Sequence, residues 1–289
     1  MPKNTIKSLA CIAILGVLLL AACSPATSTQ SPTDNSTAAP STYTPTKEAT
    51  STFTPLPPTA TPIPYSPVNS PLQGIPLSEI NTVNTNPFDP PVLGFDEPHQ
   101  GIDYSYYRYK NETMNDIDGI EGLEVLSVLD GAVASVIYDR MPYGNAIIIE
   151  TPLDSIEPAL LASITFPEIA PTLVPDPRHN CPDLVKNPAW DDANRSLYFV
   201  YAHLLNYPEQ TIGDKVLSGQ VIGQVGNTGN SSNAHLHLEL RLGPGGASFT
   251  SMAKYDTRAS LEEMANYCTW RISNRFQLLD PNLILQLQP

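Results

Sequence analysis

The sequence reads NAHLHLELRL at residues 233–242, and from His235 onward polar and apolar side chains alternate. Because strand side chains alternate between the two faces of a sheet, the leucines are predicted to point to one face, and His235 and His237 together to the other. Either histidine alone would pass as an ordinary core or surface residue. Both at this spacing on a half-buried strand indicate a chemical role.

More short strands are predicted on the N-terminal side of this stretch. Val125–Leu129 and Ala132–Tyr138 flank Asp130-Gly131, a favoured two-residue turn, and are predicted to form a hairpin. The other predicted strands are Ala146–Glu150, Leu197–Leu204 and the two halves of Val216–Val225 around a Ser218-Gly219 turn. Together these strands predict an antiparallel all-β domain.

Two long loop excursions interrupt the predicted strands. Thr151–Arg195 contains several prolines and Cys181, and Gly243–Arg275 contains Cys268 and a predicted short helix at Arg258–Tyr267. Two thiols in an oxidising compartment can pair, and neither lies in a Cys-x-x-Cys motif, so we predict a structural disulfide between Cys181 and Cys268. Long loops of this kind commonly line a substrate groove. The alternative is that these two segments are insertions without a functional role.

The N-terminus has the layout of a secretory signal. Basic residues precede the apolar run Leu9–Leu20, and Leu20-Ala21-Ala22-Cys23 resembles a lipoprotein cleavage site. We predict a signal peptide at 1–22, lipid on Cys23 and an extracytoplasmic chain anchored by that lipid to the bacterial cell membrane. An ordinary signal peptide with an incidental cysteine and an uncleaved anchor are the alternatives.

The folded part is predicted to follow a stalk. Residues 23–70 are rich in Ser, Thr and Pro, which favours an extended, Pro-stiffened tether or a passive spacer. Residues 71–289 have globular composition, with a domain core at about 90–245 and a closing strand near 276–289.

Charge excludes one class of partner. The chain has 29 acidic and 15 basic residues and a net charge of −14. Nucleic acids and anionic lipid surfaces bind proteins through positively charged patches, so no nucleic-acid partner is expected for this acidic chain. No nucleotide is expected either, because no helix signal follows the glycines of Gly226–Gly229.

Two further sequence contexts contain candidate reactive groups. In His99-Gln100-Gly101-Ile102-Asp103, an imidazole and a carboxylate are four residues apart and can ligate one metal ion. In Tyr201-Ala202-His203-Leu204, a histidine ends an apolar strand. Each context alone is a weak signal.

The order of the three histidine motifs along the chain, first 99–103, then 201–204 and then 235–239, resembles that of the lysostaphin-like peptidoglycan endopeptidases, also called the LytM-domain family. The resemblance covers roughly His99–Leu242 and the last ten or so residues, around Asp280-Pro281. It implies a two-layer antiparallel β-sandwich of the duplicated hybrid motif type, with a groove and a metal at its floor. The intervening framework includes Gly122–Val125, Tyr143–Asn145, Gly219–Gly223 and Gly226–Ser231.

The resemblance also implies roles for five residues. His99, Asp103 and His237 are expected to bind one Zn²⁺ per chain, and His203 and His235 to be catalytic without ligating the metal. Three protein ligands leave the fourth tetrahedral position open, as in catalytic zinc sites.

The expected activity is zinc-dependent cleavage of peptidoglycan stem peptides or cross-bridges. A catalytically silent module that binds or activates another wall hydrolase is the main alternative. A zinc peptidase for Gly-rich extracellular proteins and a purely structural stalked lipoprotein are the others. The segments 104–121 and 151–195 are longer than the family pattern, which leaves the cleaved bond open.

Overall fold

The computed structural model describes residues 65–106, 108–109, 117–168 and 171–285. All of them lie in one compact unit, residues 60–289. The predicted signal peptide, Cys23 and the predicted stalk up to residue 64 lie outside the described residues. Among the described residues, no helix has the length and apolar character needed to cross a membrane.

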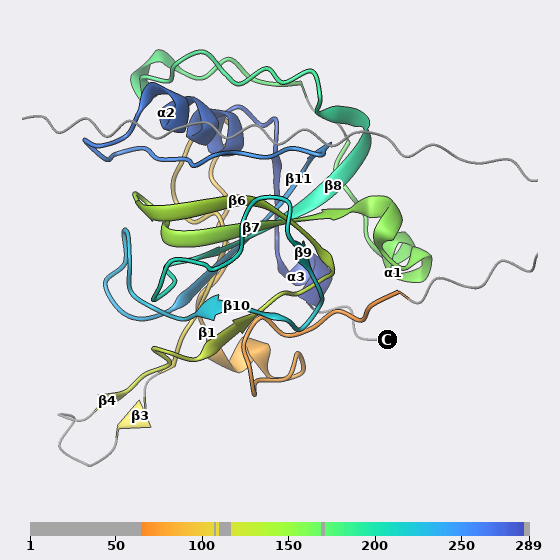
Figure 1. Cartoon of the computed structure of the whole chain (residues 1–289), viewed down its shortest axis with the longest axis vertical. Coiled ribbons are helices and arrows are strands. Elements are labelled where there is room, and N and C mark those ends of the chain that lie inside the picture. Colours follow the sequence, from red (N-terminus) through yellow and green to blue (C-terminus); the bar gives the residue numbers. More distant parts are fainter. Residues whose placement is uncertain (1–64, 107, 110–116, 169–170, 286–289) are drawn as a thin grey trace, which may run out of the picture. The chain divides into compact units, whose positions relative to one another are not determined.

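Strands dominate the described elements (Figure 1). The strands are β1 (Asn84–Asn86), β2 (Ile102–Tyr104), β3 (Arg108–Tyr109), β4 (Ile117–Asp118), β5 (Glu124–Leu126), β6 (Gly131–Arg140), β7 (Gly144–Pro152), β8 (Asp191–Ala202), β9 (Lys215–Val216), β10 (Val221–Gln224), β11 (Leu236–Gly245) and β12 (Gln277–Leu279). The helices are α1 (Pro158–Ser163), α2 (Leu261–Tyr267) and α3 (Asn282–Leu285), with 3₁₀ turns η1 (Ile80–Val83), η2 (Leu153–Ser155) and η3 (Pro177–His179) and the π-helical turn η4 (Cys268–Ile272).

One large antiparallel sheet forms the centre of the domain. Its strand order is β1-β2-β11-β8-β7-β6-β9, and β12 also pairs with β11. The strands predicted within 146–150, 197–204 and 235–242 form β7, β8 and β11 at its middle. The predicted antiparallel all-β fold class is therefore confirmed.

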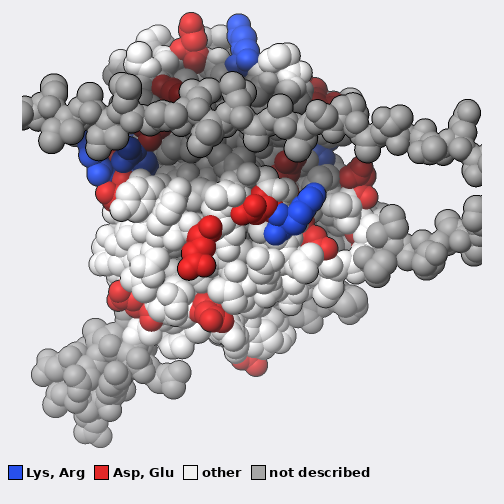
Figure 2. All heavy atoms as spheres, in the orientation of Figure 1, with Lys and Arg blue, Asp and Glu red and all other residues white. Residues whose placement is uncertain are grey.

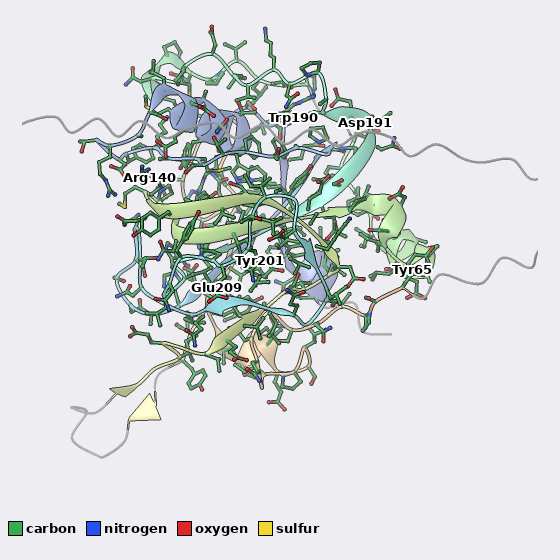
Figure 3. The ribbon with its side chains drawn as sticks, in the orientation of Figure 1. Tyr65, Arg140, Trp190, Asp191, Tyr201 and Glu209 are labelled. Atoms are coloured by element: carbon green, nitrogen blue, oxygen red, sulfur yellow. A yellow bond between two sulfur atoms is a disulfide. The ribbon has the colours of Figure 1, made fainter. Side chains whose placement is uncertain are left out.

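A small second layer covers one face of this sheet. β5 and β10 pair antiparallel, and Val125 and Ile222 join the core formed with the leucines of β11. Tyr201 of β8, labelled in Figure 3, belongs to the same core, and its hydroxyl accepts a hydrogen bond from the Val128 amide at 2.8 Å. The two layers are thus joined by apolar packing and by at least one buried hydrogen bond.

The predicted hairpin around Asp130-Gly131 is wrong. β5 pairs with β10 of the small sheet, whereas β6 pairs with β7 and β9 of the large one. The Asp130 side chain accepts hydrogen bonds from the Ser218 amide and the Ser66 hydroxyl, so this segment crosses between layers. The Asp-Gly pair lies at a bend between two strands that belong to different sheets.

The second excursion and the later part of the first cover the opposite face of the large sheet, whereas residues 153–166 pack against the same core as the small layer. Four aromatic rings pack together there, Trp190, Phe249, Trp270 and Phe276. Four of their contacts are edge to face with ring centroids 5.4–5.8 Å apart, and the Trp270–Phe276 pair is tilted at 4.8 Å. The predicted helix at 258–267 begins later, at Leu261, because Ser260 forms a capping box with Glu263.

Burial of the central strand differs from the sequence prediction. β11 was expected to be half-buried, yet residues 236–244 are buried on both faces. The polar face is covered because the second excursion folds over it, and Glu239 and Arg241 are 0% and 1% exposed. This buried charge lies beside the candidate site.

The packed part of the chain begins slightly before the predicted boundary at residue 71. The Asn69 amide donates to the Val128 carbonyl at 2.9 Å, and its side chain donates to the Ser218 hydroxyl at 2.9 Å.

On the face shown in Figure 2, most side chains are uncharged, with acidic groups scattered among them.

A disulfide joins Cys181 and Cys268, the two cysteines paired in the sequence analysis. The bond ties the first excursion to the second and spans 87 positions of sequence. Replacing both cysteines with serine is expected to lower the free energy of unfolding by roughly 2–5 kcal/mol, because the unfolded chain regains the entropy of a long open loop. Urea unfolding of the variant and of oxidised and reduced wild type measures this, and equal stability of all three would contradict it.

Candidate metal centre

The sheet register brings the predicted ligands together. Asp103 lies on β2 and His237 on β11, and the two residues are direct partners in the β2–β11 ladder. His99 lies in the loop immediately before β2, four residues from Asp103. Residues far apart in sequence therefore meet because three antiparallel strands, β2, β11 and β8, lie side by side.

Three donor atoms form a compact triangle at this point. His99 Nε2 is 3.1 Å from Asp103 Oδ1 and 3.3 Å from His237 Nδ1, and His237 Nδ1 is 2.8 Å from Asp103 Oδ1. Zinc bonds of about 2.0–2.1 Å at tetrahedral angles place neighbouring ligand atoms about 3.3 Å apart. The two nitrogens and one oxygen therefore fit a single zinc ion after small adjustments.

The surroundings of the donors also fit a metal. His99 Nδ1 is 2.9 Å from the Pro87 carbonyl oxygen, which orients the ring with Nε2 toward the triangle. Nε2 of His237 is buried without a hydrogen-bond partner and faces Glu239 Oε2 at 3.7 Å. Burial opposes ionisation of Asp103, but hydrogen bonds from His237 and His99 hold its pKa well below its usual range. The carboxylate is thus ionised, as a metal ligand must be.

His203 and His235 lie beside the triangle. Their ring centroids are 4.6 Å apart, and His235 Nε2 is 3.5 Å from Asp103 Oδ1. His203 Nδ1 lies 2.7 Å from the Thr228 carbonyl oxygen, and His235 Nδ1 lies 2.8 Å from that of Asn233. Each Nδ1 therefore donates its proton to a carbonyl, and in this tautomer Nε2 carries the lone pair.

His203 has two further unusual properties. Its backbone φ is +61°, in the left-handed region that non-glycine residues seldom adopt. Such strain persists where the surrounding structure enforces it, often at active sites. Burial, together with the nearby His237 and His235, lowers the pKa of His203 to about 3. In the metal-free protein the ring is therefore neutral at physiological pH.

All five candidate residues line one cleft of about 560 Å³. Its walls include segments 85–86, 96–98, 142–143 and 230–233, and the second excursion adds Tyr255, Tyr267 and Arg271. No role was predicted for these three residues from the sequence. They lie beyond the recognised motifs, and neither spacing nor residue type in the linear sequence marks them.

Gly101 is required by the close approach of two chains. A Cβ atom at this position would lie 2.5 Å from the Leu238 carbonyl oxygen and 2.6 Å from Cε1 of His237. Gly101→Ala is expected to displace the His237 ring and weaken zinc binding at least tenfold, as loss of a ligand's orientation does. Zinc affinity measured by chelator competition tests this. Gly223→Ala, whose Cβ would meet only the flexible Leu204 side chain, at 3.0 Å, is the control; equal affinities would contradict the prediction.

One segment of the chain matches the model of a known protein family. Residues 190–248 match Peptidase family M23. The matched segment runs from the end of the first excursion through β11, so it contains His203, His235 and His237 but neither His99 nor Asp103.

Several solved structures are similar to this chain. The catalytic domain of a mutant of the prophage-encoded M23 protein EnpA from Enterococcus faecalis is 21% identical, with 57% of this chain and 85% of that chain covered and a TM-score of 0.32. The catalytic domain of lysostaphin from Staphylococcus simulans is 19% identical, with 57% and 85% covered and a TM-score of 0.31. A zinc-containing peptidase from Vibrio cholerae is 20% identical, with 62% and 37% covered and a TM-score of 0.33.

The resemblance predicted from the order of the histidine motifs is thus confirmed by a family model, because residues 190–248 match Peptidase family M23.

Proposed function

We propose that this protein is a zinc-dependent endopeptidase that hydrolyses peptide bonds in peptidoglycan stem peptides or cross-bridges. The observation that carries the proposal is the donor triangle of His99, Asp103 and His237, with two non-ligating histidines beside it in an open cleft. A purely structural metal site would be closed by a fourth protein ligand.

The metal ligands and the other two histidines have separate roles in this proposal. His99 Nε2, Asp103 Oδ1 and His237 Nδ1 would hold the zinc. When bound, zinc supplies Lewis acidity, which lowers the pKa of water and polarises the scissile carbonyl. Of His203 and His235, one would accept the proton of the attacking water on Nε2. The N–H formed there would hydrogen-bond the oxyanion and then pass the same proton to the leaving amine. The carbonyl partners of each Nδ1 keep both rings in the orientation that this proton transfer needs.

The proposed location is the outer side of a cell membrane. We propose that lipid on Cys23 anchors the chain there, with the Ser/Thr/Pro-rich segment as the tether to the wall. The Cys181–Cys268 disulfide supports an oxidising, extracytoplasmic compartment. Peptidoglycan peptides are the proposed partners.

Peptidoglycan digestion tests the activity. Purified protein is incubated with peptidoglycan, with and without a zinc chelator, and newly freed amino groups are counted. The proposal predicts release that stops with chelator and resumes after zinc is restored, and none from a His203→Ala control. Stoichiometric zinc without release would instead support a silent module that acts on another hydrolase.

A further inference from the structure

Arg271 belongs to the second excursion, outside the segment that matches the peptidase family. It lies on η4, directly after α2, and its side chain is only 10% exposed. Three residues earlier, Cys268 is joined to Cys181. The turn that carries Arg271 is therefore fixed both by packing and by a covalent bond to the first excursion.

One side of the guanidinium contacts the segment that carries His99. Arg271 Nε donates to Asp96 Oδ1 at 2.7 Å, and Nη2 donates to the Asp96 carbonyl oxygen at 3.3 Å. Gln100 Nε2 donates to the same carbonyl oxygen at 2.9 Å and to Oδ1 at 3.1 Å. Asp96 and Gln100 thus clamp the short loop between them, and His99 is inside that loop.

The other side faces the carboxylate next to His237. Arg271 Nη1 is 3.7 Å from Glu239 Oε2, the atom that faces His237 Nε2 at the same distance. Tyr143 donates to Oε2 at 2.8 Å, and Trp270 donates to Oε1 at 2.9 Å. A carboxylate behind a histidine ligand fixes the orientation of the ring and raises its basicity.

We propose that Arg271 is a positioning residue for the metal centre, which holds His99 through Asp96 and His237 through Glu239. The inference rests on the proposed zinc site. In this proposal the second excursion does more than line the cleft, because its Arg271 also helps to orient two of the three metal ligands.

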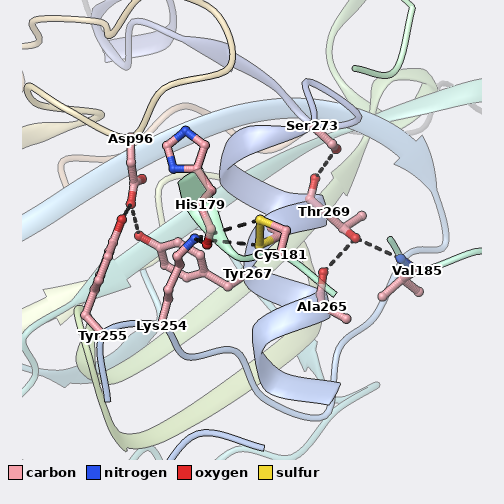
Figure 4. The surroundings of a disulfide bond; sticks show 11 residues. Asp96, His179, Cys181, Val185, Lys254, Tyr255, Ala265, Tyr267, Thr269 and Ser273 are labelled. Carbon is pink, nitrogen blue, oxygen red and sulfur yellow. Dashed lines mark hydrogen bonds between the residues drawn. A yellow bond between two sulfur atoms is a disulfide. The ribbon is translucent and has the colours of Figure 1, made fainter. Parts of the chain in front are cut away.

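The surroundings of the disulfide extend this support (Figure 4). Tyr255 and Tyr267 both donate to Asp96 Oδ2, at 3.0 and 2.6 Å. Lys254, beside Tyr255, donates to the His179 carbonyl oxygen at 2.5 Å, and its Nζ is 3.8 Å from Cys181 Sγ. The residues that hold Asp96 therefore belong to the same disulfide-tied unit as Arg271.

Removing the positive charge would disturb both carboxylates together. Asp96 and Glu239 are 5% and 0% exposed, so neither can turn to water without moving the backbone. Asp96 would lose its guanidinium partner, whereas Glu239 would lose the cation beside Oε2 but keep Arg241, whose Nε donates to Oε1. A buried carboxylate with too few partners is costly, and it recovers partners by rearranging. Rearrangement of these two residues moves the groups that orient His99 and His237.

The test compares Arg271→Met with Arg271→Lys and with a control, Arg275→Met. Arg275 lies four residues away and pairs with Asp192, whose side chain is 65% exposed, outside the cleft lining. Zinc affinity is measured by chelator competition, the cobalt(II) absorption spectrum reports ligand geometry, and urea unfolding of the metal-free proteins reports stability. We expect Arg271→Met to weaken zinc binding about 10–100-fold and to change the cobalt spectrum, as loss of an outer partner does. Arg271→Lys should lose less zinc affinity than Arg271→Met, and Arg275→Met should keep the zinc affinity and cobalt spectrum of the wild type.

Two results would overturn the inference. The first is wild-type zinc affinity and cobalt spectrum in folded Arg271→Met. If that variant does not fold without metal, Arg271→Lys decides in the same way, and unchanged affinity and spectrum again reject the positioning role. Wild-type protein that binds no zinc would be a different failure, because it would reject the proposed function as well.

Discussion

Replacing His237 with alanine will abolish zinc binding and peptidase activity together. His237 Nδ1 is one corner of the donor triangle, and His237 is paired in register with Asp103. Loss of an outer partner typically weakens metal binding 10–100-fold, and loss of a ligand is expected to exceed about 100-fold. Metal content after dialysis and amino-group release from peptidoglycan measure the two effects. Asp103→Ala should likewise lose zinc binding and activity together.

His179→Ala is the matched control for this loss. His179 lies on η3 near the disulfide, and it is not among the residues that line the cleft. Its replacement should leave both zinc content and activity unchanged. Zinc retained at wild-type affinity by His237→Ala would show that the metal is held elsewhere.

Replacing His203 or His235 with alanine will remove activity while zinc stays bound. Neither imidazole belongs to the donor triangle, yet both lie in the same cleft with Nε2 available for proton transfer. A positioned general acid or base contributes typically about 10²–10⁴-fold to rate, so kcat should fall by that order. Zinc content and kcat measured on the same preparations separate this loss from that of His237→Ala. Equal metal loss in all the variants would contradict the division between ligands and catalytic residues.

The histidine motifs could be read from the sequence because strand periodicity is local. Alternation in 235–242 correctly placed His235 and His237 on one face, and the antiparallel register of β11 with β2 and β8 then brings Asp103 and His203 to the same point. The strands themselves were predictable for the same reason. Their partners were not: β5 pairs with β10 and not with β6, because burial between layers outweighs a turn signal.

The support around the site was beyond the reach of sequence patterns. Arg271 meets Asp96 across 175 positions of sequence, and the contact forms only because the second excursion folds over the polar face of β11. The same fold-back explains why Glu239, on a strand predicted to be half-buried, is fully buried. Pairings of this kind depend on how loops pack, for which periodicity provides no signal.

The most direct test of the central claim is a crystal structure of the zinc-loaded protein with anomalous diffraction recorded at the zinc edge. We expect one peak within bonding distance of His99 Nε2, Asp103 Oδ1 and His237 Nδ1, with a fourth position open to the cleft and with His203 and His235 unbound. A peak ligated by His203 or His235, or no peak in the triangle, would contradict it.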